Sequence, residues 1–91
     1  MTDNVTDNKA RSRYELVTDG HTAFAAYEIA GQVITFTHTI VPEALQGQGI
    51  ASRLIAAALA DVRARGLKLI PECEFVRAYL EKHPDQKDLL A

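Results

Sequence analysis

The middle of the chain joins a glycine pair to a strongly amphipathic helix pattern. Gly47 and Gly49 stand directly before this pattern, and Gly66 supplies a stop signal after it. Arginine and aspartate side chains lie mainly on the other faces. The sequence therefore predicts a helix over residues 50–65 that buries one stripe against a core. The apolar residues of that stripe are Ile50, Leu54, Ile55, Ala58, Leu59 and Val62.

Three segments with the alternation of β-strands precede this helix. The first begins at Tyr14 and ends at the turn formed by Asp19 and Gly20. The second covers roughly residues 23–29 and the third residues 33–41, and both are rich in β-branched or aromatic side chains. We expect these three strands to form an antiparallel meander.

The third strand has one face that suits the core better than the other. Side chains alternate between the two faces of a strand, and here valine and threonine fill one face. The other face is therefore predicted to be buried, which would put a histidine at the end of an apolar row. That face consists of Ile34, Phe36, His38 and Ile40.

The segments after the central helix complete the predicted fold. Residues 67–70 form a short buried strand that Pro71 ends, and strand, helix, strand in this order implies a right-handed parallel crossover. A last helix over about residues 72–83 would carry an apolar stripe from Cys73 to His83. The predicted class is α/β (α+β): an antiparallel β-meander, a β-α-β crossover and a C-terminal helix.

Length and composition favour one small domain. Residues 1–12 are polar and lack the apolar centre of a signal peptide, so we expect a flexible segment there and a single domain over 13–91. No apolar run reaches the roughly 20 residues of a membrane helix. The single cysteine excludes an internal disulfide and favours a reducing, cytoplasmic location. The net charge of -2 argues against nucleic acid as a partner.

The glycine pair is a candidate anion site. The first amides of a helix lack internal partners and lie at the positive end of its dipole, an effect of about 0.3–1 kcal/mol for an anion. Glycine at positions 47 and 49 would permit close approach of a phosphate, and Arg53 could add a cation. A P-loop is excluded because Ile50 and Ala51, not lysine and serine or threonine, follow Gly49. The alternative that glycine only satisfies turn geometry stays open.

The residues around this loop resemble a known family. They match the signature of the GNAT acetyltransferases, in which Gln or Arg, two residues and Gly are followed by one residue and Gly or Ala. His38-Thr39 before the loop, and Leu67 to Pro71, Cys73 and His83-Pro84 after it, are similar to a group of very small single-domain members, the YjdJ-like proteins. The signature residues here are Gln46, Gly47, Gln48, Gly49, Ile50 and Ala51.

This resemblance implies a minimal GNAT-like fold and acetyl-CoA as cosubstrate. Residues 46–51 would bind the pyrophosphate of coenzyme A through backbone amides, with Arg53 as a helper. The strands on either side of the helix would splay apart to admit the pantetheine arm, with the backbone of Val41 as its edge partner. The acceptor would be a small or peptidyl amine.

Two residues are candidates for catalysis. His38 could deprotonate an acceptor amine, because an unperturbed imidazole titrates near the working pH, or it could be hydrogen-bonded structure. Cys73 opens a helix, which favours a thiolate, and the resemblance puts it near the acetyl thioester. The neighbouring Glu72 and Glu74 disfavour that thiolate, and a place in the apolar stripe points to burial.

The predicted function is transfer of acetyl from acetyl-CoA to an amine by an N-acetyltransferase. The alternative is a module that binds coenzyme A or acyl-CoA without turnover, because the chain lacks the early helices and late strands that wall the acceptor site of full GNAT enzymes. A third hypothesis is an interaction domain in which the glycine loop is structural. The three histidines show no ligand spacing, so we expect no metal.

Overall fold

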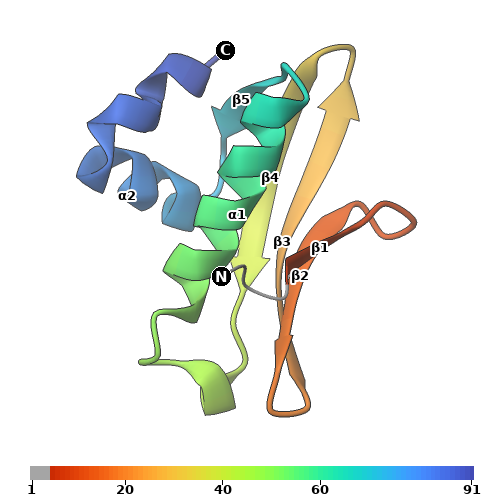
Figure 1. Ribbon diagram of the computed structural model, residues 1–91, viewed down its shortest axis with the longest axis vertical. Coiled ribbons are helices and arrows are strands. Elements are labelled where there is room, and N and C mark those ends of the chain that lie inside the picture. The colour runs from red at the N-terminus through yellow and green to blue at the C-terminus, as the bar shows by residue number, and fades with distance from the viewer. Residues whose placement is uncertain (1–4) are drawn as a thin grey trace.

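One five-stranded sheet carries both α-helices on the same face, as the computed structural model of residues 5–91 shows (Figure 1). The strands follow one another across the sheet in chain order. Neighbours are antiparallel except for β4 and β5, which are parallel. The elements are β1 (Val5–Asn8), β2 (Arg13–Thr18), β3 (His21–Ala30), β4 (Val33–Ile40), the 3-10 helix Glu43–Leu45, α1 (Ile50–Ala64), β5 (Lys68–Pro71), α2 (Glu74–Lys82) and the 3-10 helix Pro84–Leu89.

The meander and the crossover predicted from the sequence are confirmed. Strands β2, β3 and β4 pair antiparallel through short turns, and β4, α1 and β5 form the parallel crossover. All the apolar residues predicted for the α1 stripe are buried. The helix ends as a Schellman motif, because Leu67 N–H bonds to the Val62 carbonyl and Gly66 N–H to the Arg63 carbonyl.

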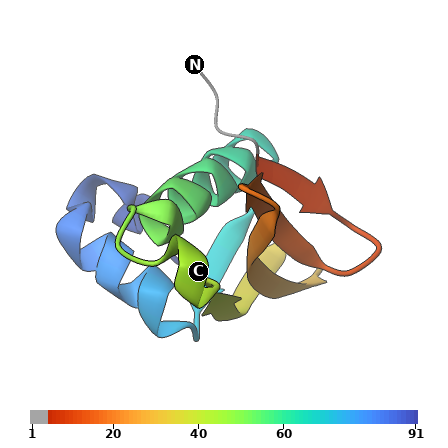
Figure 2. The ribbon, with the colours of Figure 1, turned by 90° about the horizontal axis from the view of Figure 1, so that it is seen from below.

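The core lies between the sheet and the two helices. Figure 2 shows α1 crossing β1, β2 and β3 while α2 lies over the β4 and β5 side. Ala23 and Ala25 of β3 are fully buried, and their small side chains let α1 approach the sheet closely. The opposite face of the sheet carries exposed apolar residues such as Val17 and Ile40. The two helices therefore determine which face of each strand is buried.

The expectation of a flexible segment over residues 1–12 is wrong for the part that the structure describes. Residues Val5–Asn8 form β1, which pairs antiparallel with β2. Val5 packs against the core, and Asp7 accepts a hydrogen bond from the hydroxyl of Tyr27. The polar composition concealed this strand, because one of its inward side chains, that of Asp7, is held by a polar contact. Residues 1–4 lie outside the described part of the chain.

The predicted core face of β4 is correct only for its first half. Ile34 and Phe36 are buried, but His38 and Ile40 are exposed and Thr39 is buried instead. The pairing with β3 shifts at this point, because Tyr27 pairs with Phe36 while the preceding residue of β3 pairs with His38. Thr37 is thus an extra residue, and such a bulge inverts which side chains face the core.

The last part of the chain covers the end of the sheet. Cys73, Val76 and Leu80 of the predicted stripe are buried, whereas His83 is exposed, so that residue was wrongly included. β5 is buried on one side only, with Leu69 inside and Ile70 exposed. Pro84–Leu89 form a 3-10 helix that buries Leu89.

A polar cluster closes the core near β1. The Tyr14 hydroxyl donates to Asp61 at 2.6 Å and the Tyr27 hydroxyl donates to Asp7 at 2.5 Å. Arg65 lies between the two carboxylates, with Nη1 at 3.2 Å from Asp7 and 3.4 Å from Asp61. Burial and these carboxylates raise the pKa of Tyr14 far above its usual value and that of Tyr27 to about 12. The cluster joins β1, β2 and β3 to α1.

Candidate functional site

The loop between β4 and α1 is braced by its own side chains. Leu45, at the end of the first 3-10 helix, is buried and anchors the loop to the core. The Gln46 side-chain amide donates to the Val41 carbonyl at 3.2 Å, and the Gln48 side-chain amide donates to the Ala44 carbonyl at 3.3 Å. These glutamines therefore hold the shape of the loop.

The two glycines of the loop have backbone angles that other residues rarely adopt. Gly47 has a φ of +81° and Gly49, the N-cap of α1, has a φ of +71°. A Cβ at either position would meet no atom within 4 Å, so the space in front of the loop is open. Glycine is required here by the left-handed backbone, and the open space leaves room for a bound group beside bare peptide.

The backbone amides at the start of α1 lie beside this open space. No hydrogen bond from the amides of residues 47–52 to another described residue meets ordinary distance and angle limits. The first helical bond runs from the Arg53 amide to the Gly49 carbonyl at 3.1 Å. Such a row of unbonded amides at the positive end of a helix dipole fits an anionic group such as a pyrophosphate.

A pocket of about 360 Å³ lies directly against these amides, and we call it the loop pocket. Its walls come from the end of β4, the loop, the first turn of α1 and the start of α2. Two of the predicted residues, Gln48 and Arg53, are not among its lining residues, and Arg53 is exposed. The lining residues that matter below are Val41, Leu45, Gly49, Ala51, Ser52 and Phe75.

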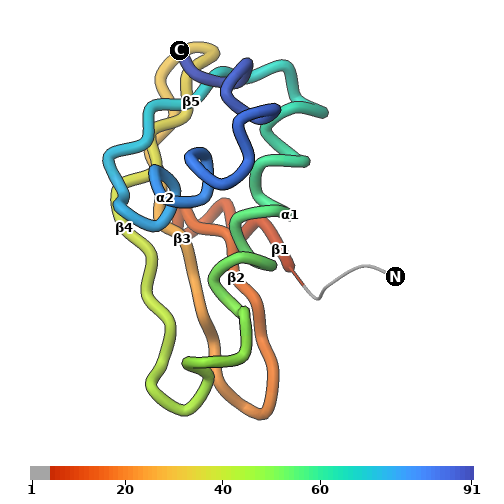
Figure 3. Tube along the Cα trace, turned by 90° about the vertical axis from the view of Figure 1, so that its left-hand side faces the viewer, coloured from red at the N-terminus to blue at the C-terminus, as the bar shows by residue number. Residues whose placement is uncertain are grey.

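Strands β4 and β5 separate halfway along β4. Their pairing ends at Phe36 and Pro71, after which β4 continues with β3 as its one partner strand while the chain turns into α2 (Figure 3). The Cys73 amide bonds back to the Phe36 carbonyl at 2.9 Å and marks the point of separation. Beyond it, Thr39 Oγ1 lies 3.1 Å from Cys73 Sγ. The splay that the resemblance implied is thus a feature of this fold.

An open groove of about 400 Å³ lies at this point, and we call it the splay groove. His38 and Cys73, the two catalytic candidates, both line it. The bulge in β4 turns His38 outward, where its ring meets the edge of Phe24 with 6.0 Å between centroids. The other lining residues include Thr39, Glu72, Glu74 and Arg77. Carboxylate, imidazole and guanidinium groups therefore share one solvent-exposed groove.

Cys73 is the N-cap residue of α2 and is only 4% exposed. Its sulfur contacts the Thr39 hydroxyl, and its carbonyl accepts the Arg77 amide in the first turn of the helix. The predicted burial of this residue is confirmed. Cys73 lines the splay groove together with its exposed neighbours Glu72 and Glu74.

Sequence reasoning missed Phe75, Ser52 and Thr39. Phe75 is 48% exposed and borders both the loop pocket and the splay groove, so it connects these two hollows. Ser52 follows the signature by one residue on the first turn of α1. Thr39 became an inward residue only through the bulge. Of these three residues, Phe75 alone left a signal in the sequence, as an exposed aromatic at the start of an amphipathic helix.

Among residues 5–91 no group of three histidine, cysteine, aspartate or glutamate side chains is arranged to hold a metal ion. Neither of the α-helices in the described part of the chain is long and apolar enough to cross a bilayer.

Comparison with solved structures gives a close match in fold. The solution NMR structure of a GCN5-like protein from Staphylococcus aureus superposes with a TM-score of 0.74, at 25% sequence identity. The match covers 100% of this chain and 91% of that one. The mixed sheet, the crossover helix and the terminal helix are thus features of a known acetyltransferase fold.

Comparison of sequences points the same way. Protein NATD1 of Gallus gallus and that of Mus musculus are each 36% identical to this chain over 63 residues, which is 68% of this chain and 57% of theirs. The matched segment therefore spans little more than half the length of those relatives. Members of the GNAT group use acetyl-CoA, and the model of the GCN5-related N-acetyltransferase domain matches residues 13–89. The chain accordingly belongs to the GCN5-related N-acetyltransferase family.

Proposed function

We propose that this protein transfers the acetyl group of acetyl-CoA to a primary amine. The observation that carries the proposal is the row of amides over residues 47–52, which form no hydrogen bond of ordinary geometry to a described residue and lie beside the open space at Gly47 and Gly49. A pyrophosphate supplies the charge and the acceptor oxygens that these amides lack. Gln46 and Gln48 brace the loop, and Arg53 adds a positive charge one turn into the helix.

The pantetheine arm would lie in the loop pocket, along Val41, Leu45 and Phe75. The Val41 carbonyl accepts a hydrogen bond from the Gln46 side chain. The backbone amide of Val41 is therefore the group left to pair with the pantetheine arm. Beyond Phe75 the pocket borders the splay groove, and a thioester that reached this border would lie near Cys73 and Thr39. An amine entering the groove could then meet it from the open side.

The chemistry is a direct substitution at the thioester carbonyl. The amine nitrogen forms a bond to the carbonyl carbon, the nitrogen loses a proton, and the carbon–sulfur bond breaks to release coenzyme A as the thiol or thiolate. His38 is the proposed proton acceptor, because its ring is exposed in the groove. Cys73 contributes position, and backbone amides near the splay would stabilise the oxyanion.

The acceptor class follows from the shape and charge of the splay groove. The groove is open, so it can admit either a small amine or the amino group of a peptide. Glu72 and Glu74 at its rim would attract an ammonium group before it loses its proton. We expect this reaction to take place in the cytoplasm, with no nucleic acid or membrane as partner.

The openness of the splay groove also favours a second function, the binding of coenzyme A without catalysis. If nothing walls the acceptor, the protein could hold coenzyme A or an acyl-CoA without turnover. To separate the two functions, pure protein is incubated with acetyl-CoA, with and without a panel of small amines and short peptides, and free thiol is followed with a chromogenic disulfide. Amine-dependent thiol release supports the transferase. Tight binding of coenzyme A by calorimetry with no such release would establish the binding module instead.

A further inference from the structure

The splay groove carries charged groups of both signs that do not pair with one another. Glu72 and Glu74 flank Cys73 in the chain, and both line the groove. Arg77 lines it as well, one helical turn after Cys73, whose carbonyl accepts the Arg77 amide. No carboxylate within residues 5–91 forms an ion pair with Arg77. A groove that keeps opposite charges apart suits a ligand with both an ammonium and a carboxylate group.

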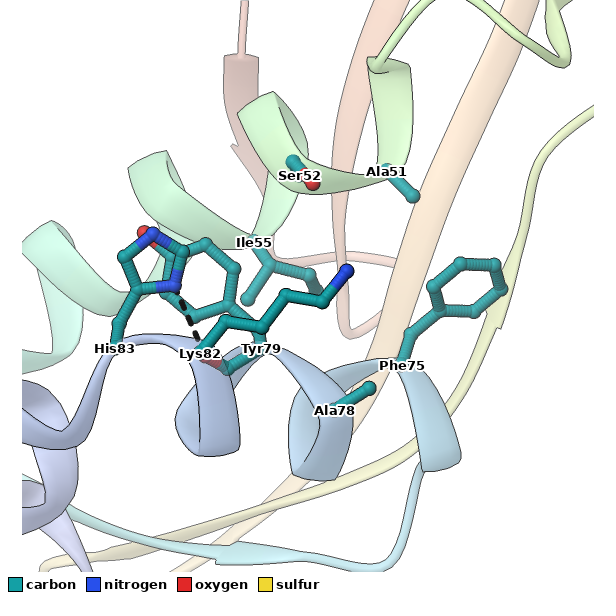
Figure 4. Close-up of a pocket in the computed structure, with 8 residues that line it drawn as sticks. All are labelled: Ala51, Ser52, Ile55, Phe75, Ala78, Tyr79, Lys82 and His83. Atoms are coloured by element: carbon teal, nitrogen blue, oxygen red, sulfur yellow. Dashed lines mark hydrogen bonds between the residues drawn. The ribbon is translucent and has the colours of Figure 1, made fainter.

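The Arg77 side chain is tied to the end of β5. Its Nη1 donates to the Pro71 carbonyl at 3.3 Å, in keeping with the tendency of helical side chains to point back towards the helix N-terminus. The opposite side of α2 faces α1 and carries Ala78 and Lys82 (Figure 4). The other N–H groups of the guanidinium bond to no described residue. They present a planar fork that matches a carboxylate.

A further hollow borders the splay groove at Arg77. We call it the C-terminal pocket; it has a volume of about 240 Å³ and lies between α2, the end of β5 and the last 3-10 helix. Arg77 lines both hollows, and Pro71 of the pocket directly precedes Glu72 of the groove. One small ligand can therefore occupy both. The pocket is lined by Pro71, Arg77, Leu80, Glu81, Lys87 and Leu90.

The rest of the C-terminal pocket is close to neutral. Pro71, Leu80 and Leu90 supply apolar surface. Lys87 Nζ lies 3.3 Å from Glu81 Oε2, so the charges of these two side chains largely cancel. An uncharged apolar group is what such walls favour, because it leaves water without leaving a charge unpaired.

We propose that the acceptor amine is a free α-amino acid with an apolar side chain, such as leucine. The inference rests on the proposed function for the reaction. The amino group lies in the splay groove, the carboxylate binds Arg77 at the junction, and the side chain enters the C-terminal pocket. The amine nitrogen forms the bond to the acetyl carbon and gives its proton to His38, and the products are the N-acetyl amino acid and coenzyme A. A diamine would bring a second positive charge towards Arg77, which disfavours it.

The test compares leucine with leucinol, in which a hydroxymethyl group replaces the carboxylate. The wild type should acetylate leucine with a kcat/KM roughly 10-fold higher, the size of one charge-assisted contact at an exposed site. In Arg77→Gln this preference should fall to about one. Arg11→Gln makes the same change of charge in the turn between β1 and β2 and should keep the wild-type preference. An equal preference in Arg77→Gln and the wild type would overturn the carboxylate contact.

A second variant tests the C-terminal pocket without touching a charge. Leu90 is 37% exposed, and Leu90→Ser removes apolar surface from the pocket wall. The wild type should prefer leucine to alanine by roughly 10-fold, because more carbon leaves water, and Leu90→Ser should lower this preference several-fold. Val17→Ser, on the open face of the sheet, is the matched control and should keep it. An unchanged preference in folded Leu90→Ser would reject this pocket as the side-chain site.

Binding is followed separately by NMR through the Nε–H signal of Arg77, which leucine should shift far more than leucinol does. This shift together with leucine-dependent thiol release from acetyl-CoA supports both proposals. The shift without thiol release supports the amino acid site and rejects the transferase. Thiol release that is no faster with leucine than with leucinol or 1,4-diaminobutane rejects the amino acid site, while the transferase stands. If leucine leaves the signal unchanged and no amine releases thiol, both proposals are rejected.

Discussion

Thr39 Oγ1 lies 3.1 Å from Cys73 Sγ, and this contact joins β4 to the start of α2 across the splay. It exists because the extra residue Thr37 rotates Thr39 into the core. Both partners are buried, so the sulfur is held between a hydroxyl and the core. A thiol held in this way is suited to shaping the wall of the splay groove, which Cys73 lines.

We therefore expect Cys73→Ala to retain acetyl transfer. The loss of a buried sulfur leaves a small cavity and an unpaired Thr39 hydroxyl, which should lower the free energy of unfolding by roughly 1–2 kcal/mol. The rate of transfer to an amine should fall by less than about 10-fold, because Cys73 helps to shape the groove and is not the nucleophile of the reaction. Denaturant unfolding and the thiol-release assay measure the two effects.

Mass spectrometry gives the opposing test for the cysteine. Wild-type protein mixed with acetyl-CoA alone should carry no acetyl group on Cys73. An acetylated cysteine that discharges when amine is added would replace direct transfer by a two-step mechanism. Cys73→Ser is a useful companion variant, because serine removes the sulfur but keeps a smaller polar group that can contact Thr39.

His38 is expected to accept a proton from the amine. His38→Gln keeps polarity and approximate size but removes basicity, so amine-dependent turnover should drop about 10²- to 10⁴-fold. The acidic limb of the pH–rate profile should change as well. His21→Gln is the matched control, because His21 is also exposed but is the first residue of β3, whereas His38 pairs with the middle of that strand, and His21 lines no described pocket. An unaltered profile in His38→Gln would make His38 a structural residue.

The sequence was sufficient for the parts of the fold that depend on strong periodic patterns. The α1 stripe is continuous over four turns, and Gly66 ends it through backbone bonds that glycine favours. Local patterns could not reveal the bulge at Thr37, because a bulge is set by pairing with β3 and leaves no mark in the alternation of β4 itself. For the same reason His38 was assigned to the wrong face.

The edge strand β1 and the walls of the site could not be predicted from the sequence for a different reason. Val5–Asn8 are mostly polar, and their place in the sheet depends on Asp7 meeting Tyr27 and Arg65, which are distant in sequence. Ser52 and Phe75 likewise come together only when α2 folds onto α1. The glycine loop could be recognised because its residues are consecutive.

Gly49→Ala should separate binding from folding. With a φ of +71°, an alanine at the N-cap of α1 is strained by about 1–2 kcal/mol, and its methyl group projects into the open space in front of the amides. Coenzyme A affinity should fall by at least about 10-fold, because the pyrophosphate would lose close approach to the backbone. Calorimetry on the folded variant measures this change.

Gly20→Ala provides the matched control for the loop. Gly20 has a φ of +74° in the β2–β3 turn, and a Cβ there also meets no atom within 4 Å. This variant should show a similar loss of stability and unchanged coenzyme A affinity. If Gly49→Ala also binds with wild-type affinity, the loop is structural and the anion site must lie elsewhere.

The cluster that joins β1 to α1 predicts a loss of stability in alkali. In the folded protein the pKa of Tyr27 is raised to about 12 from an ordinary value of 10.0, mainly by burial and by its bond to Asp7. A raised pKa means that the unfolded chain releases this proton first. Its contribution to stability is therefore complete below pH 10 and is lost as the pH rises towards 12, by up to about 1.4 kcal/mol per pH unit.

Tyr27→Phe should accordingly be less stable than the wild type at pH 7, because Asp7 loses a buried hydrogen bond, yet lose less stability between pH 10 and pH 12. Urea unfolding at a series of pH values measures both effects. Phenolate absorbance in a Tyr79→Phe background reports only on Tyr14 and Tyr27, since the chain has 3 tyrosines. Equal alkaline slopes in the wild type and Tyr27→Phe would mean that the phenol is not held by Asp7 in solution, and that β1 is attached by its backbone pairing, by Val5 and by the Arg65–Asp7 ion pair.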